Sequence, residues 1–239
     1  VVTMVPGTDL KDETIAVGGH YDSVEFSLGS WDNGAGTVQV LGLLKHLSQH
    51  PPRRTVKAIL FGSEEIGLEG SKAYMAAHPE EGESLLCMVN LDGGGNLLGS
   101  EFAMVTATSA AEDYLRGILK EGGFSLELKP GVMSSDGTVF ADYTVPAINF
   151  ASYTPRQGGY MHTRYDNMDM ISADVLDHEV RQLIYVFARL TDAEVFPIER
   201  KISEEMQKDI VKYFGEGRSQ TEKRKKGEKP ESEGKAEEN

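Results

Sequence analysis

The chain has 239 residues, of which 39% are hydrophobic and 26% charged, the composition of an ordinary globular domain with a sizeable core. No apolar run approaches the roughly 20 residues that a membrane span needs. Cys87 is the one cysteine, so intrachain disulfide bonds and thiolate zinc sites are excluded, and any metal must be held by His, Asp and Glu.

The net charge of −14 is unevenly distributed. Residues 218–239 carry 7 Lys+Arg against 6 Asp+Glu, so the other 217 residues carry a charge of −15. A globular part this acidic argues against nucleic acid or an anionic membrane as a partner. It suits a cationic ligand, such as a free amine or metal ions.

Apolar runs with strand character alternate along the chain with helical patterns. The strand-like runs are residues 14–17, 56–61, 85–91, 102–106 and 145–150. The helical patterns are residues 34–49, 110–121 and 173–191, the first with Val38, Leu41, Leu44 and Leu47 on one face. This alternation predicts a three-layer α/β/α sandwich around a mixed, mostly parallel sheet.

The C-terminal part differs in composition from the rest. Residues 198–217 read as a helical extension that packs on the outside of the domain. Residues 218–239 contain no aromatic residue and no aliphatic residue larger than Ala, so we expect a disordered, charged tail there.

Polar residues follow several of the predicted strands. "TIAVGG" leads to His20 and Asp22, "VKAILFGS" to Glu64 and Glu65, "CMVNL" to Asp92, and "PAINFASY" through a loop to His162; Asp32 stands just before the first predicted helix. Each has an ordinary alternative, such as a helix cap or a turn residue. Ligands of open α/β sheets bind outside the carboxyl ends of the strands, so we expect these residues to meet at one edge.

This set of side chains suits a site for two metal ions. Zinc binds imidazole nitrogen and carboxylate oxygen and leaves a position open for water in catalytic sites. In His20-x-Asp22, the carboxylate is placed to hold the second ring N–H of a ligating imidazole. Glu64 and Glu65 point in different directions at a strand end, so one can bind metal while the other acts as general base.

The segments "GGHYDSV", "WDNGAGT", "ILFGSEEIGLEGSKAY", "NLDGGG" and "HTRYDNMD" resemble the co-catalytic di-zinc aminopeptidases of peptidase family M28. The resemblance covers residues 1–197, the expected catalytic domain. It implies two zinc ions, replaceable by cobalt or manganese. One ion would be held by His20 and Asp92 and the other by Glu65 and His162, with Asp32 bridging them. Glu64 would be the general base, and Asp22 would orient His20. It also implies a cis peptide bond between Asp32 and Asn33.

The activity that this resemblance implies is hydrolysis of the N-terminal peptide bond of a peptide with a free amino terminus. It also implies a secreted or extracytoplasmic location, although no signal peptide is present. Two departures stand out. Many relatives have a tyrosine directly before the last histidine ligand, where this chain has Met161, so Tyr160 is the candidate for stabilising the oxyanion. Relatives usually have a helical segment before the strand near Val1, so we expect an N-terminally truncated domain. The sequence leaves the oligomeric state open.

Three other readings remain. A related metallopeptidase family pairs H-x-D with two glutamates but usually carries an inserted domain, for which this chain has no room. A glutaminyl cyclase-like acyltransferase shares the fold and uses one zinc ion. A non-catalytic receptor-like domain on the same fold typically lacks ligands or the base, which are all present here.

Overall fold

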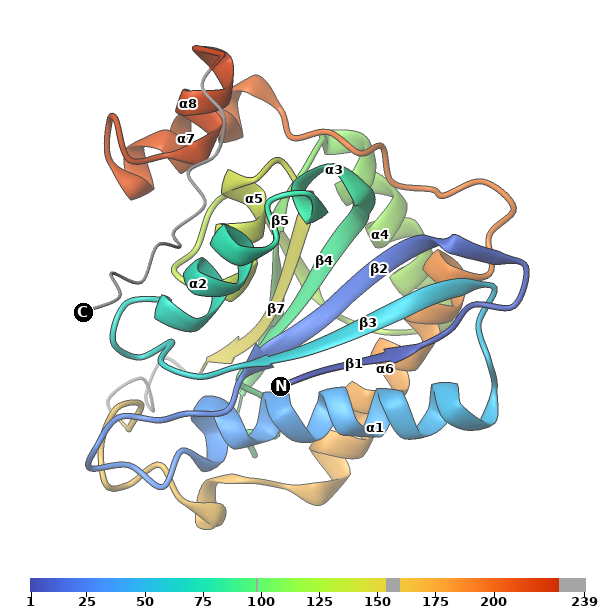
Figure 1. Ribbon diagram of the computed structural model, residues 1–239. Helices are drawn as coiled ribbons and strands as arrows, with labels where there is room; N and C mark the ends of the chain where they lie inside the picture. Colours follow the sequence, from blue (N-terminus) through green and yellow to red (C-terminus); the bar gives the residue numbers. More distant parts are fainter. Residues whose placement is uncertain (98, 154–159, 228–239) are drawn as a thin grey trace, which may run out of the picture.

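The computed structural model describes residues 1–97, 99–153 and 160–227, and it contains a seven-stranded sheet between layers of helices (Figure 1). The strand order is β1-β3-β2-β4-β7-β5-β6. The strands are β1 (Val2–Val5), β2 (Leu10–His20), β3 (Arg54–Phe61), β4 (Leu85–Asp92), β5 (Ser100–Thr106), β6 (Glu127–Pro130) and β7 (Ala147–Tyr153). The helices are α1 (Gly36–Gln49), α2 (Glu69–Ala77), α3 (Glu81–Ser84), α4 (Ser109–Gly122), α5 (Asp136–Asp142), α6 (Ala173–Thr191), α7 (Glu204–Phe214) and α8 (Gln220–Lys225), with short turns η1 (Ser30–Ala35) and η2 (Met168–Met170).

The sheet is mixed and mostly parallel, as predicted. Strand β2 runs parallel to both β3 and β4, β7 runs parallel to β4, and β6 runs parallel to β5. Strands β1 and β5 run antiparallel to their neighbours β3 and β7. The carboxyl ends of β3, β2, β4 and β7 therefore lie next to one another at one edge of the sheet.

Helices cover both faces of the sheet, and each face has its own apolar core (Figure 1). The larger cluster joins the sheet to α1, α4 and α6, through residues such as Leu43, Leu115 and Phe187. The smaller cluster joins it to α2 and α5, through Met75 and Phe140. The predicted three-layer sandwich is confirmed. No helix within the described ranges is long and apolar enough to cross a membrane.

The sequence explains where α4 and α6 begin. The Thr108 hydroxyl accepts a hydrogen bond from the N–H of Ala111, and the Ser172 hydroxyl accepts one from the N–H of Val175. These side chains satisfy backbone donors that a first helical turn leaves free.

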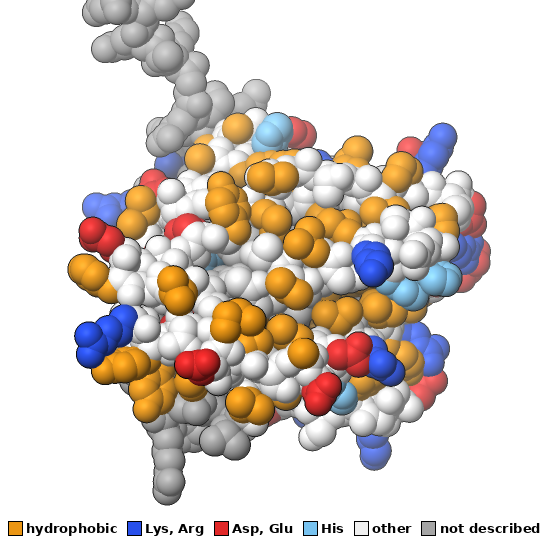
Figure 2. Space-filling model, turned by 90° about the horizontal axis from the view of Figure 1, so that it is seen from below, with side chains coloured by type: hydrophobic (Ala, Val, Ile, Leu, Met, Phe, Trp, Pro, Cys, Tyr) orange, Lys and Arg blue, Asp and Glu red, His pale blue; other side chains and the backbone are white. Residues whose placement is uncertain are grey.

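The buried face of α1 is only in part the apolar face that the sequence pattern shows. Leu47 is buried as expected, but Val38 and Leu41 are 49% and 52% exposed, and Val40 and Leu43 are buried instead. The helix carries two overlapping apolar stripes, and packing against α6 and the sheet selects one of them. Figure 2, seen from below where α1 and α6 lie in Figure 1, shows hydrophobic side chains spread over this face.

The start of the region predicted to be disordered is folded. Helix α8 lies within it, and Ser219 and Thr221 are buried. The carboxylate of Asp142, at the end of α5, accepts hydrogen bonds from the Ser219 hydroxyl and from the backbone N–H groups of Gln220 and Thr221. The composition of the segment could not reveal this anchor, because it belongs to a residue far away in the sequence. Residues 228–239 of the predicted tail lie outside the described residues.

Replacing Asp142 by Ala should release α8, because the substitution removes all three of these hydrogen bonds. Trypsin should then cut the Arg218–Lys225 segment at least about five-fold faster, and unfolding should become easier by about 1–3 kcal/mol. Limited proteolysis with mass spectrometry and urea unfolding measure the two effects. Asp209→Ala, at an exposed position of α7, is the matched control. Equal cleavage of both variants would contradict the anchor.

Candidate metal centre

The predicted ligands meet at the carboxyl edge of the sheet. His20 is the last residue of β2 and Asp92 the last of β4. Glu64 and Glu65 follow β3, and His162 lies in the loop after β7. The left-handed backbone of Ser63 and Leu68, each with a φ of 61°, turns the chain on either side of the two glutamates.

One group of ligand atoms forms around His20, which is buried. Its Nε2 lies 3.2 Å from Asp32 Oδ1, 3.4 Å from Asp92 Oδ1 and 4.0 Å from Glu64 Oε2. His20, Glu64 and Asp92 each offer an atom within a distance that one metal ion spans.

A second group forms around His162. Its Nε2 lies 2.9 Å from Glu65 Oε2 and 3.1 Å from Asp32 Oδ2. Asp32 therefore presents one carboxylate oxygen to His20 and the other to His162. The two adjacent glutamates are divided in the same way, Glu64 with the first group and Glu65 with the second.

The electrostatics of the cluster call for positive charge. Burial alone would lower the pKa of His20, but the carboxylates of Asp32 and Asp92 beside it outweigh burial and raise the pKa to about 12. Burial, reinforced by the charge of Asp92, raises the pKa of Glu64 to about 8. Burial and the charge of Asp32 raise the pKa of Glu65. Raised carboxylate pKa values are expected where several carboxylates are buried close together with few positive charges to balance them.

The residues fit metal ions. His20 Nε2 and Glu65 Oε1 are buried polar atoms without a hydrogen-bond partner among the described residues, and His20 Nε2 faces the carboxylates of Asp32 and Asp92. An imidazole nitrogen surrounded by carboxylate oxygens is a donor set that zinc prefers. His20, Asp32, Glu65, Asp92 and His162 are thus the residues that could hold zinc.

Asp22 contacts both sides of this site. Its carboxylate accepts hydrogen bonds from the backbone N–H groups of Glu64 and Glu65, at 3.2 and 3.3 Å. His20 Nδ1 lies 3.1 Å from the carbonyl oxygen of Asp22 and 3.5 Å from its carboxylate. The Asp22 carboxylate therefore positions the glutamate pair, whereas the closer contact to His20 comes from the Asp22 carbonyl oxygen.

Asn33 joins three of the segments that carry ligands. The peptide bond before it, Asp32–Asn33, is cis, which confirms the expectation from the resemblance. Its side-chain NH₂ donates to the carbonyl oxygens of His20 and Leu91, and its side-chain oxygen accepts from the N–H groups of Gly36 and Gly93. Asn33 thus fixes the ends of β2 and β4 relative to the start of α1.

Asp166 is a positioning residue that sequence reasoning missed. Its buried carboxylate accepts hydrogen bonds from the backbone N–H groups of Trp31, at 2.7 Å, and Asp32, at 3.0 Å. It ties the loop of His162 to the loop of Asp32. The sequence feature that could have indicated this role is its position four residues after His162 in "HTRYDNMD".

A residue of α6, Glu179, stabilises the turn after Asp92. The buried carboxylate of Glu179 accepts the N–H of Gly95, and burial together with nearby Glu101 raises the pKa of Glu179 to about 9. Gly94 has a φ of 149°, and a Cβ there would lie 2.1 Å from Gln39 Nε2. The glycines of "DGGG" are thus required by close packing.

The ligands open into a cleft of about 680 Å³. Met161 lines this cleft. Among the described residues that line the cleft, Tyr160 is absent, and the Tyr160 ring packs against the ring of Tyr165. Tyr213 and Phe214 at the end of α7 also line the cleft, so the helical extension predicted to pack outside contributes to the site.

Ser135 is a further neighbour of the ligands that sequence reasoning missed. Its hydroxyl donates to Asp92 Oδ2 and accepts from the side-chain NH₂ of Asn90. The hydrogen bond fixes the Asp92 carboxylate from the side that faces away from His20.

Comparison with known proteins identifies the class. Residues 1–187 match peptidase family M28, and the chain belongs to this family. A zinc aminopeptidase from Bacillus subtilis has the same fold, with 25% sequence identity, a TM-score of 0.72, and coverage of 86% of this chain and 53% of that one. A glutaminyl cyclase from an Acidobacteriales bacterium shares the fold at 21% identity and a TM-score of 0.69, over 80% of this chain and 72% of that one.

The curated relatives are longer proteins. A vacuolar membrane protease of Yarrowia lipolytica is 31% identical over 192 residues, which are 76% of this chain and 19% of the relative. One of Clavispora lusitaniae is 27% identical over 220 residues, 89% of this chain and 21% of the relative. The chain thus spans about a fifth of these relatives. The expectation of a secreted or extracytoplasmic protein is wrong, because these relatives are named as proteases of the vacuolar membrane.

Replacing Asp166 by Ala should weaken the metal site, because two buried N–H groups beside Asp32 lose their acceptor. We expect zinc affinity to fall by about 10–100-fold and stability by about 2–4 kcal/mol. Competition with a chromophoric chelator and thermal unfolding measure the two effects. Asp169→Ala, an exposed position on the same loop, is the control. If Asp166→Ala bound zinc as tightly as that control, the positioning role would be refuted.

Proposed function

We propose that this chain is the catalytic domain of a zinc aminopeptidase that uses two metal ions. The observation that carries the proposal is the placement of Asp32, whose two carboxylate oxygens face two separate groups of ligand atoms. His20 and Asp92 would hold one ion, Glu65 and His162 the other, and Asp32 would bridge them. Membership in peptidase family M28 supports a peptidase.

Zinc bound in this way would polarise the scissile carbonyl and lower the pKa of a bound water. Glu64 is the residue of the cluster left to act as general base. Burial raises its pKa to about 8, and the charge of bound zinc would lower that pKa again, so the ionised carboxylate could take a proton from water and return it to the leaving amine. Asp22 holds Glu64 in place through the backbone N–H.

The acidic surroundings support a substrate with a positive charge. A peptide with a free amino terminus meets this requirement, because its α-amine is a cation at neutral pH. The substrate that we propose is therefore the N-terminal end of a peptide.

Replacing Glu64 by Gln should abolish hydrolysis while leaving the metals in place. We expect turnover of leucine 4-nitroanilide to fall by at least about 10²–10⁴-fold, the usual contribution of a general base. Zinc content, measured by elemental analysis, should remain that of the wild type, and a chelator should stop wild-type turnover.

The matched control is Glu25→Gln, an exposed glutamate on the loop between His20 and Asp32. If Glu64→Gln retained the activity of this control, Glu64 would not be the base. Absence of amide cleavage by zinc-loaded wild type, with one ion bound, would favour the cyclase-like alternative. No metal binding at all would favour a non-catalytic domain.

A further inference from the structure

Beside the cleft with the candidate metal ligands lies a second hollow of about 310 Å³, between α2 and the α7–α8 segment. The walls of both hollows include Lys72 of α2 and Phe214 of α7, so the two adjoin at these residues. The described wall of the second hollow contains none of the five metal-ligand candidates. It therefore extends the cleft away from the metal centre.

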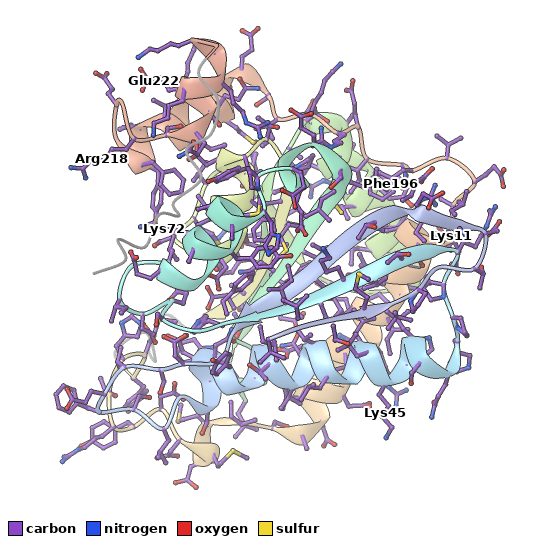
Figure 3. All side chains as sticks on the ribbon, viewed as in Figure 1. Lys11, Lys45, Lys72, Phe196, Arg218 and Glu222 are labelled. Carbon is purple, nitrogen blue, oxygen red and sulfur yellow. The ribbon has the colours of Figure 1, made fainter. Side chains whose placement is uncertain are left out.

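Two cations line this extension, which we call the Lys72–Arg218 groove. Lys72 lies where the two hollows adjoin, and Arg218, between α7 and α8, lines the far part. Figure 3 shows both side chains on the same side of the molecule, whereas Lys45 lies on α1.

The wall of the groove carries two cations, Lys72 and Arg218, and two carboxylates, Glu69 and Asp142. Lys72 Nζ lies 3.5 Å from Glu69 Oε1, and both side chains are exposed. Arg218 has no ion pair within the part of the chain that the structure describes. Asp142 is buried and accepts the hydrogen bonds of residues 219–221, whereas Arg218 is exposed at the far wall of the groove.

The wall between the metal centre and the two cations is apolar and fixed in place. Leu68, Met133 and Phe214 line it, and the Tyr213 hydroxyl lies 2.6 Å from Ser134 Oγ across the cleft. Phe214 also packs against the core cluster of α2 and α5. An extended peptide thus meets carboxylates at one end of the cleft, apolar side chains along it and cations beyond.

We propose that the Lys72–Arg218 groove binds the part of the substrate beyond the scissile bond and selects peptides with an acidic side chain there. The proposal rests on the proposed aminopeptidase function, in which the α-amine lies at the acidic end of the cleft. The rest of the peptide then passes Lys72 and Phe214, and a Glu or Asp side chain pairs with Lys72 or Arg218.

The test uses tetrapeptide amides of sequence Leu-Ala-Ala-Ala, in which Glu or Gln replaces one residue at a time. For the wild type, kcat/KM should be about five-fold higher for Glu than for Gln at one or more positions after the first, as expected of a partly exposed ion pair. This ratio should approach one in Lys72→Gln or Arg218→Gln. It should remain five-fold in Lys45→Gln, and it should decrease with added salt.

Equal rates for Glu and Gln at every position after the first would overturn the proposal. So would a ratio that survives in both Lys72→Gln and Arg218→Gln, or a preference confined to the first residue. Leucine 4-nitroanilide has no residue beyond the scissile bond and tests the aminopeptidase function by itself. If the wild type did not cleave it, calorimetric affinities of the Glu and Gln peptides for zinc-loaded protein would give the same ratio without turnover.

Discussion

Repulsion among carboxylates at one edge of the sheet is the constraint on which the rest of this structure depends. Asp22, Asp32, Glu64, Glu65 and Asp92 converge on two histidines, where the parallel strands end. The carboxylates of Asp32 and Asp92 raise the pKa of His20 despite its burial, and burial raises the pKa values of Glu64 and Glu65. Such a cluster stores unfavourable energy that bound cations would relieve, so the fold is built to need them.

Backbone and side-chain hydrogen bonds around the ligands resist this repulsion. Asn33 fixes the ends of β2 and β4, Asp166 fixes the loop of Asp32, and Glu179 fixes the turn after Asp92. Each of these residues is buried, and each bonds to backbone rather than to a ligand side chain. The positions of the ligands are therefore set by the main chain, which moves less than side chains on loops.

The sequence predicts the sheet and the meeting of the candidate ligands at its edge, because both depend on local patterns. The apolar runs before His20, Glu64 and Asp92 are β2, β3 and β4, and parallel strands bring their ends together. The residues that the sequence could not reveal act over long distances. Asp166 supports Asp32 from 134 residues away, and Asp142 folds a segment whose own composition favours disorder. Helix α1 shows the same limit of sequence-based prediction. It has two apolar stripes, and only packing against α6 and the sheet determines which of them is buried.

The most direct test of the account is the number and position of zinc ions in crystals of zinc-loaded protein, measured by anomalous scattering at the zinc absorption edge. We expect two peaks on opposite sides of the Asp32 carboxylate, one beside His20 and Asp92 and the other beside Glu65 and His162. A single peak, or peaks away from Asp32, would contradict the bridging role of this carboxylate and with it the two-metal mechanism.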